Sequence, residues 1–169
     1  GRIEKAEKEI DASQRSIDMM CMKLLLRQQP VAKDLRLVTA ASKMATDMER
    51  IGDQALDMAE LAQYCDLSGD PAEKEIYAMT AEVINMLVSS IDAFVKRDTQ
   101  AAADVIERDD TADSMFGVIR NILAVSIESR QISGAQALDT LMTAKYLERI
   151  GDHATNIAEQ TIFAVTGKI

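Results

Sequence analysis

One segment of this chain occurs twice, and the second copy follows the first by 99 residues. Residues 48–60 read MERIGDQALDMAE, and residues 147–159 read LERIGDHATNIAE. A match of this length and quality does not arise by chance, so it indicates the tandem duplication of one structural unit. The fold must therefore place two similar units within 169 residues.

Apolar residues recur at alternating spacings of three and four along most of the chain, which is typical of amphipathic helices. The breaks between these stretches carry capping or turn residues, namely Pro30, Asp70, Asp98 and Ser133. Seven Gly and two Pro are too few for the turns of a many-stranded sheet. The pattern predicts five helices in an all-α antiparallel bundle, at about 2–28, 30–66, 71–96, 99–129 and 134–167.

The charge balance excludes several classes of partner. Acidic residues outnumber basic ones by 28 to 19, and no run of Lys and Arg could track a phosphate backbone, so we expect no nucleic-acid partner. The longest uncharged apolar stretch, residues 83–91, is about half of what a membrane span needs, and the N-terminus has no apolar secretory core. We therefore expect a cytoplasmic protein without membrane insertion. Two cysteines are too few for a disulfide framework, so we expect Cys21 and Cys65 to be core residues.

Acidic residues lie four apart within each copy of the repeat. They are Glu49, Asp53 and Asp57 in the first copy, and Glu148 and Asp152 followed by the neutral Asn156 in the second. A helix turns once in 3.6 residues, so each set lies along one helix face. Like charges at this spacing destabilise a helix, and so does the glycine in each motif. A purely structural helix has no reason to keep both features in two copies, which suggests that the acids form a functional site.

The helix before each copy adds two more acids. If each pair of helices forms an antiparallel hairpin, Glu7 and Asp11 lie beside the first motif, and Asp109 and Asp113 lie beside the second. The two pairs align with a single offset of 102 residues, so they belong to the duplication. Each repeat should bring about four or five oxygen ligands together across two helices.

Clustered carboxylates repel one another, and a bound cation relieves that repulsion. Oxygen ligands favour Mg, Ca, Mn or Fe, and the one histidine, His153, could assist Zn or Fe. The alternative is that these acids face solvent and pair with Arg50, Arg149, Lys43 and Lys145. In that case the chain is a purely structural acidic helical-bundle module that binds partner helices without metal.

Catalytic motifs are missing from the sequence. Ferritin-like di-iron proteins need a Glu-x-x-His on each of two helices, and this chain has a single histidine. It has no Gly-rich phosphate loop, no Gly-x-Ser-x-Gly elbow, and no paired nucleophile and base. We therefore expect no enzymatic activity.

Two segments resemble the PhoU family of phosphate-uptake regulators. They read Gln-Pro-Val-Ala-Lys-Asp-Leu-Arg at 29–36 and Met-Glu-Arg-Ile-Gly-Asp at 48–53. The resemblance implies a tandem repeat of a three-helix unit. Residues 1–67 would form an incomplete first repeat of two helices, and residues 70–169 a second repeat of three. The first of the family's six helices is then missing here.

The resemblance also implies metal ligands. It assigns Glu49, Asp53 and Asp57 to the first metal-binding motif, Glu148, Asp152 and the weaker ligand Asn156 to the second, and Glu7 and Asp109 to the acidic position of the preceding helix. The metal would be a divalent or trivalent ion such as Fe, Mn, Zn or Mg.

The function that the resemblance implies is regulatory. Members of that family restrain phosphate uptake and the transcriptional response to phosphate starvation. They link the ATPase of a phosphate transporter to a membrane sensor histidine kinase. We expect this chain to be such a metal-binding adaptor. A missing helix would expose an apolar groove on the first repeat, so we also expect a homodimer.

Overall fold

The computed structural model describes residues 1–168, which form five helices and no strand. The helices are α1 (Arg2–Gln28), α2 (Ala32–Leu61), α3 (Glu73–Lys96), α4 (Thr99–Glu128) and α5 (Gly134–Thr166). The predicted all-α bundle is thereby confirmed. Ile169, the last residue of the predicted second repeat, lies outside the described residues.

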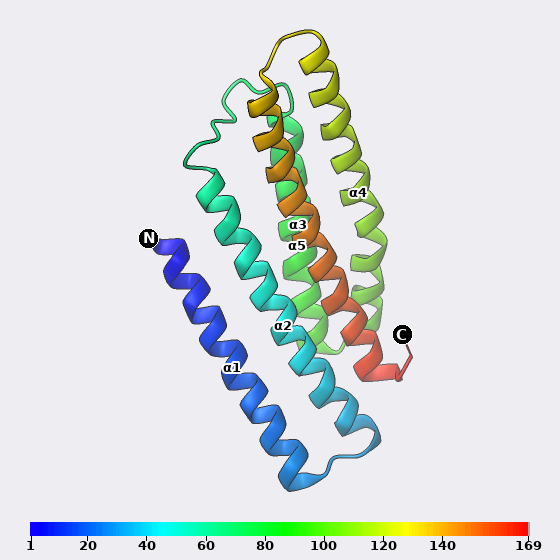
Figure 1. The fold of residues 1–169 in the computed structure, drawn as a ribbon. Coiled ribbons are helices and arrows are strands. Elements are labelled where there is room, and N and C mark those ends of the chain that lie inside the picture. Colours follow the sequence, from blue (N-terminus) through cyan, green and yellow to red (C-terminus); the bar gives the residue numbers. More distant parts are fainter. Residues whose placement is uncertain (169) are drawn as a thin grey trace.

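The helices run alternately up and down and fall into two groups (Figure 1). In one group, α3, α4 and α5 each contact the other two. In the other group, α1 contacts only α2, which in turn contacts α5. The helix α5 is therefore central, since it contacts α2, α3 and α4. The division of the chain into units at 1–67 and 70–169 remains a prediction.

Small and medium apolar side chains fill the core. Met79, Met86, Ile119 and Ile157 have no exposed surface, and neither do Ala144, Ala154 and Ala158 of α5. Such small residues let neighbouring helices approach α5 closely and keep the interior well packed.

Both ends of α2 differ from the sequence prediction. The helix begins at Ala32 rather than Pro30, because the backbone just before Ala32 is extended. It ends at Leu61 rather than near Asp66, because residues 62–64 continue only as turns with a mixture of short-range hydrogen bonds. Apolar spacing alone does not reveal this fraying, since the side chains beyond Leu61 keep a helix-like pattern.

Asp70 fixes the link between α2 and α3. The sequence predicts Asp70 as the N-cap of a helix starting at Pro71, but α3 begins two residues later at Glu73. Asp70 is only 5% exposed, and its carboxylate accepts hydrogen bonds from the Ala72 N–H and from the Thr140 hydroxyl of α5, both at 2.8 Å. It therefore joins the start of α3 to α5.

The helix α3 is apolar on two sides. Within residues 1–168 it is the one helix long and apolar enough to cross a membrane, although its longest uncharged run is shorter than a span. One face buries Met79, Val83 and Met86, and the opposite face exposes Tyr77 and Val88. Length and composition are weak evidence for a span here, because a core helix passes the same test.

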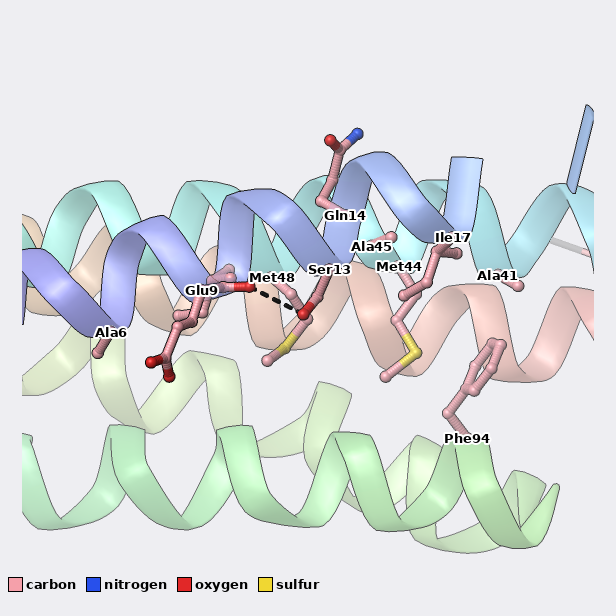
Figure 2. A pocket seen from close by; sticks show the side chains of 11 residues that line it. Ala6, Glu9, Ser13, Gln14, Ile17, Ala41, Met44, Ala45, Met48 and Phe94 are labelled. Carbon is pink, nitrogen blue, oxygen red and sulfur yellow. Dashed lines mark hydrogen bonds between the residues drawn. The ribbon is translucent and has the colours of Figure 1, made fainter. Parts of the chain in front are cut away.

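An apolar groove of about 630 Å³ lies between α1, α2 and the end of α3 (Figure 2). Ile10 and Ile17 of α1, Ala45 and Met48 of α2, and Phe94 of α3 line it. The second-repeat counterparts of the first four residues are Ala112, Ile119, Ala144 and Leu147, which are all buried in the α3–α5 group. The groove therefore lies, in the first repeat, at the position that α3 fills in the second repeat.

Replacing Asp70 with Ala should lower the free energy of unfolding by about 2 kcal/mol, because it leaves a buried hydroxyl and a buried N–H without their acceptor. Urea denaturation measures this change. Asp66→Ala is the matched control, since Asp66 is exposed and accepts a single bond from the Ser68 N–H. Equal effects of the two substitutions would contradict the role given to Asp70.

Candidate metal centre

The acids of the first repeat converge between α1 and α2. Glu7 and Asp11 of α1 and Asp53 of α2 each place a carboxylate oxygen within 4.8 Å of the other two. All three side chains are partly buried. Carboxylates arranged in this way can ligate one hard cation, for which oxygen–metal distances are typically about 2.0–2.6 Å.

Gly52 allows α1 to approach α2 at this level. A β-carbon on Gly52 would lie 3.3 Å from Ile10 Cδ1, which is closer than ordinary packing. On Gly151 of the second copy, a β-carbon would meet its nearest neighbours, Asp109 Oδ1 among them, at an ordinary 3.9 Å. Close helix packing therefore explains the glycine of the first motif. The presence of this glycine is then weaker evidence that the motif serves a metal site.

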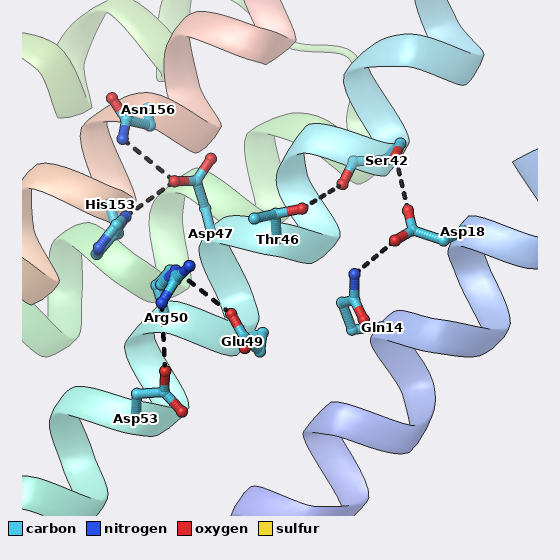
Figure 3. Close-up of polar contacts among 10 residues, drawn as sticks. All are labelled: Gln14, Asp18, Ser42, Thr46, Asp47, Glu49, Arg50, Asp53, His153 and Asn156. Atoms are coloured by element: carbon cyan, nitrogen blue, oxygen red, sulfur yellow. Dashed lines mark hydrogen bonds and ion pairs between the residues drawn. The ribbon is translucent and has the colours of Figure 1, made fainter.

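Arg50 competes for the same acids (Figure 3). Its Nε lies 3.6 Å from the Glu49 carboxylate, and its Nη1 lies 3.7 Å from that of Asp53. The Arg50 side chain is 57% exposed, so such pairs are typically worth up to about 1 kcal/mol. Glu49 and Asp57 lie outside the three-acid set, and Asp57 is exposed on the next turn of α2.

The second repeat holds a more open set of acids on α4 and α5. Burial raises the pKa of Asp109, and the charges of Asp113, Asp110 and Glu148 add to the rise. The pKa of Asp152 is raised by burial and then by the charges of Glu148, Asp109 and Asp113. These carboxylates are thus close enough to repel. Within residues 1–168, however, no three of them bring oxygens within 4.8 Å of one another.

Lys145 supplies a cation within the second set. Its ammonium donates to Glu148, whose side chain is 16% exposed, and it opposes the rise in the pKa of Asp152. The same ammonium lies 5.4 Å from the centroid of the Phe116 ring, a cation–π distance. Thr46 occupies the corresponding position of the first copy, so Lys145 distinguishes the two repeats.

The geometry supports part of each interpretation of the acids. Arg50 and Lys145 pair with motif acids, as the solvent-facing alternative requires, whereas Arg149 and Lys43 form no ion pair within the described residues. The acids still outnumber these cations. In addition, the buried hydroxyl of Thr155 faces the Asp109 carboxylate and lowers the pKa of Asp109 against the rise that burial causes. Carboxylate oxygens in excess of the nearby cations are the donors that a hard cation prefers.

Asn156 and His153 reach across to the first repeat (Figure 3). Asp47 Oδ1 accepts a hydrogen bond from Asn156 Nδ2 at 3.1 Å and lies 2.9 Å from His153 Nδ1. Only the amide oxygen of Asn156 then remains for a metal ion. Sequence reasoning missed Asp47, because Tyr146 is its counterpart in the second copy and the repeat carries no matching acid.

The acids of the second set should destabilise the metal-free protein at neutral pH. Because the pKa of Asp152 is raised in the folded state, its ionised form costs stability above that pKa, and the cost disappears as the pH falls toward the ordinary value of 3.8. Asp152→Asn should raise Tm by about 1–2 °C at pH 7 and by progressively less toward pH 4. Thermal unfolding in chelator measures both effects.

Glu107→Gln is the control for this experiment, since Glu107 is an exposed acid of the neighbouring helix α4 outside the set. It should leave Tm nearly unchanged across the same pH range. A gain from Asp152→Asn that persists undiminished at pH 4 would contradict the repulsion argument.

Known proteins resemble this chain closely. The PhoU domain profile matches residues 1–62 and 76–161. The chain is 39% identical over 163 residues to the phosphate-specific transport system accessory protein PhoU homolog of Clostridium acetobutylicum, and 37% identical over 174 residues to the Burkholderia homolog. These matches cover 94% and 98% of this chain, and 74% and 72% of the relatives.

Solved structures show the same arrangement of helices. PhoU from Pseudomonas aeruginosa superposes with a TM-score of 0.91 at 33% identity, covering 99% of this chain and 81% of that one. The phosphate transport system regulatory protein PhoU from Streptococcus pneumoniae has a TM-score of 0.88 at 24% identity, covering 98% of this chain and 78% of that one, and shows the fold alone. Together with the family profile, these similarities show that the chain belongs to the PhoU family.

Proposed function

We propose that this chain is a metal-dependent, non-enzymatic regulator of phosphate uptake. The observation that carries the proposal is the duplicated set of acids, one between α1 and α2 and one between α4 and α5. Homologues of the chain are accessory proteins of the phosphate-specific transport system. A regulator in that setting needs a signal, and metal occupancy of the acidic sets is a signal that this geometry can carry.

Each set offers oxygen ligands from two helices. In the first set, Glu7, Asp11 and Asp53 would hold the ion, with Glu49 on the same face of α2 within reach after release from Arg50. In the second set, the ligands would be Asp109, Asp113, Glu148, Asp152 and the amide oxygen of Asn156. A bound Fe, Mn, Zn or Mg ion would supply positive charge that joins the two helices of each pair.

The partners in this proposal are cytoplasmic. The chain would connect a phosphate transporter ATPase with a sensor histidine kinase, and so restrain uptake and transcription when phosphate is plentiful. A net charge of −9 suits partners that present basic surfaces, because complementary charge speeds association and selects the partner. The alternative is an acidic interaction module without metal, and the pairing of Arg50 and Lys145 with motif acids favours it.

Metal content tests the proposal directly. Protein purified without chelator or chelating resin should contain Fe, Mn, Zn or Mg in stoichiometric amounts. Glu49→Ala/Asp53→Ala should remove the metal of the first set, and Glu148→Ala/Asp152→Ala the metal of the second, because each substitution deletes two ligands. Elemental analysis of the three proteins measures the loss.

Thermal unfolding of the same proteins separates the two interpretations. If Glu148→Ala/Asp152→Ala raises Tm and leaves the metal content unchanged, the acids are solvated charges that merely repel. Absence of metal from every sample, even after soaking with each ion, would favour the acidic module and a basic partner.

The apolar groove supports self-association through a second copy of the chain. Light scattering should give a mass above the 18.6 kDa of one chain, and Ile17→Glu should reduce it, because a charge would then lie among apolar groove residues. Tyr77→Glu is the control, since Tyr77 is exposed outside the groove. A mass of one chain at high concentration would contradict the dimer.

A further inference from the structure

A second kind of site lies at the lower end of the bundle in Figure 1, where α2 begins and α3 and α5 end. A pocket of about 240 Å³ is formed there by Lys33, Asp34 and Leu37 of α2, Arg97 at the end of α3, and Ala164 and Val165 of α5. We call it the basal pocket. Lys33 lies twenty residues before Asp53 on α2, which places the pocket about 30 Å from the first acidic set.

Cationic side chains meet at the basal pocket although they are scattered along the sequence. Lys33 and Arg97 line it, and Arg36 stands three residues after Lys33 on the same helix. None of these three forms an ion pair within residues 1–168, although the chain as a whole carries nine more acidic than basic charges. The first turn of α2 adds the positive end of a helix dipole.

Arg36 has an unsatisfied donor beside the pocket. Its Nε is buried and has no hydrogen-bond partner. Its guanidinium is held against the end of α5, where a β-carbon on Gly167 would lie 3.3 Å from Arg36 Cζ. Gly167 also has a positive φ of 76°, so both its conformation and this contact favour glycine. A buried guanidinium N–H without a partner is costly unless an acceptor binds to it.

Asp34 indicates which anion can bind. Asp34 lines the basal pocket, and an ionised carboxylate accepts hydrogen bonds but cannot donate them. Sulfate at neutral pH carries no proton, so it would be repelled by Asp34. Hydrogen phosphate has the same tetrahedral shape and a P–OH group that can donate to a carboxylate. The pocket is also smaller than the roughly 300–1,000 Å³ of most organic-ligand sites, which favours a small ion.

We propose that the basal pocket binds inorganic phosphate in its protonated form. Lys33 and Arg97, which line the pocket, would neutralise the anion together with the nearby Arg36, and Asp34 would accept a hydrogen bond from the phosphate hydroxyl. The site does not depend on metal, since its residues lie on other turns of α2 and α5 than the acidic sets. It would give the chain a direct contact with the ion whose transport its homologues serve.

Titration with inorganic phosphate, followed by amide NMR, tests the proposal. Saturable shifts should concentrate at residues 31–37, 97 and 164–168, which separates this pocket from phosphate bound to a metal ion at the acids. Lys33→Gln and Arg97→Gln, both at exposed positions, should each raise Kd by about tenfold, because each removes a charge-assisted contact. Lys43→Gln, an exposed lysine further along α2, should leave Kd unchanged.

Sulfate provides the test of selectivity. The chain should bind phosphate at least about tenfold more tightly than sulfate, and Asp34→Asn should narrow that ratio by strengthening sulfate binding. Absence of saturable shifts at the basal pocket would overturn the proposal. So would equal affinity for the two ions, or a Kd that Arg97→Gln does not change. Metal content plays no part in these outcomes, so a failure here leaves the metal proposal standing.

Discussion

The packing of α5 against three other helices determines where everything else in this fold can lie. Its Ala144, Gly151, Ala154 and Ala158 are small and buried, so α2, α3 and α4 can all approach it. The contacts then run in the order α1, α2, α5, α4. One acidic set lies between the first two helices and the other between the last two, so the central pair of α2 and α5 separates them. The duplication is thus visible as two acidic sets on either side of the packed pair of α2 and α5.

Much of this arrangement could be predicted because it depends on local periodicity. Apolar spacing located all five helices, and Asp98 and Ser133 cap α4 and α5 as predicted. The short turn between α1 and α2 fixes the hairpin register, which is why Glu7 and Asp11 could be placed beside Asp53 without a structure. Such inferences succeed where the position of a residue is set by the helix that carries it and by one short turn to the next helix.

Contacts between distant elements could not be predicted in the same way. Asp47 meets His153 across α2 and α5, and no pattern within either helix indicates that pairing. The basal pocket likewise joins Lys33 to Arg97, two isolated cations in a sequence without any basic run. The sequence has no basic run, and these two cations meet only because helix ends far apart in sequence lie at one end of the bundle.

The two acidic sets differ in the cation that each already contains, and this difference affects how a metal ion could enter. Arg50 is mostly exposed and lies at 3.6–3.7 Å from its acids, so an incoming ion would displace a weak, solvated pair. Lys145 donates to a Glu148 that is largely buried, and its ammonium also rests near the Phe116 ring. An ion entering the second set would have to displace a better-held charge. If metal acts as the signal, the duplicated sets would therefore not fill together. The first repeat would respond at lower metal concentration, and the second would keep its Lys145–Glu148 pair within α5 until the concentration rises.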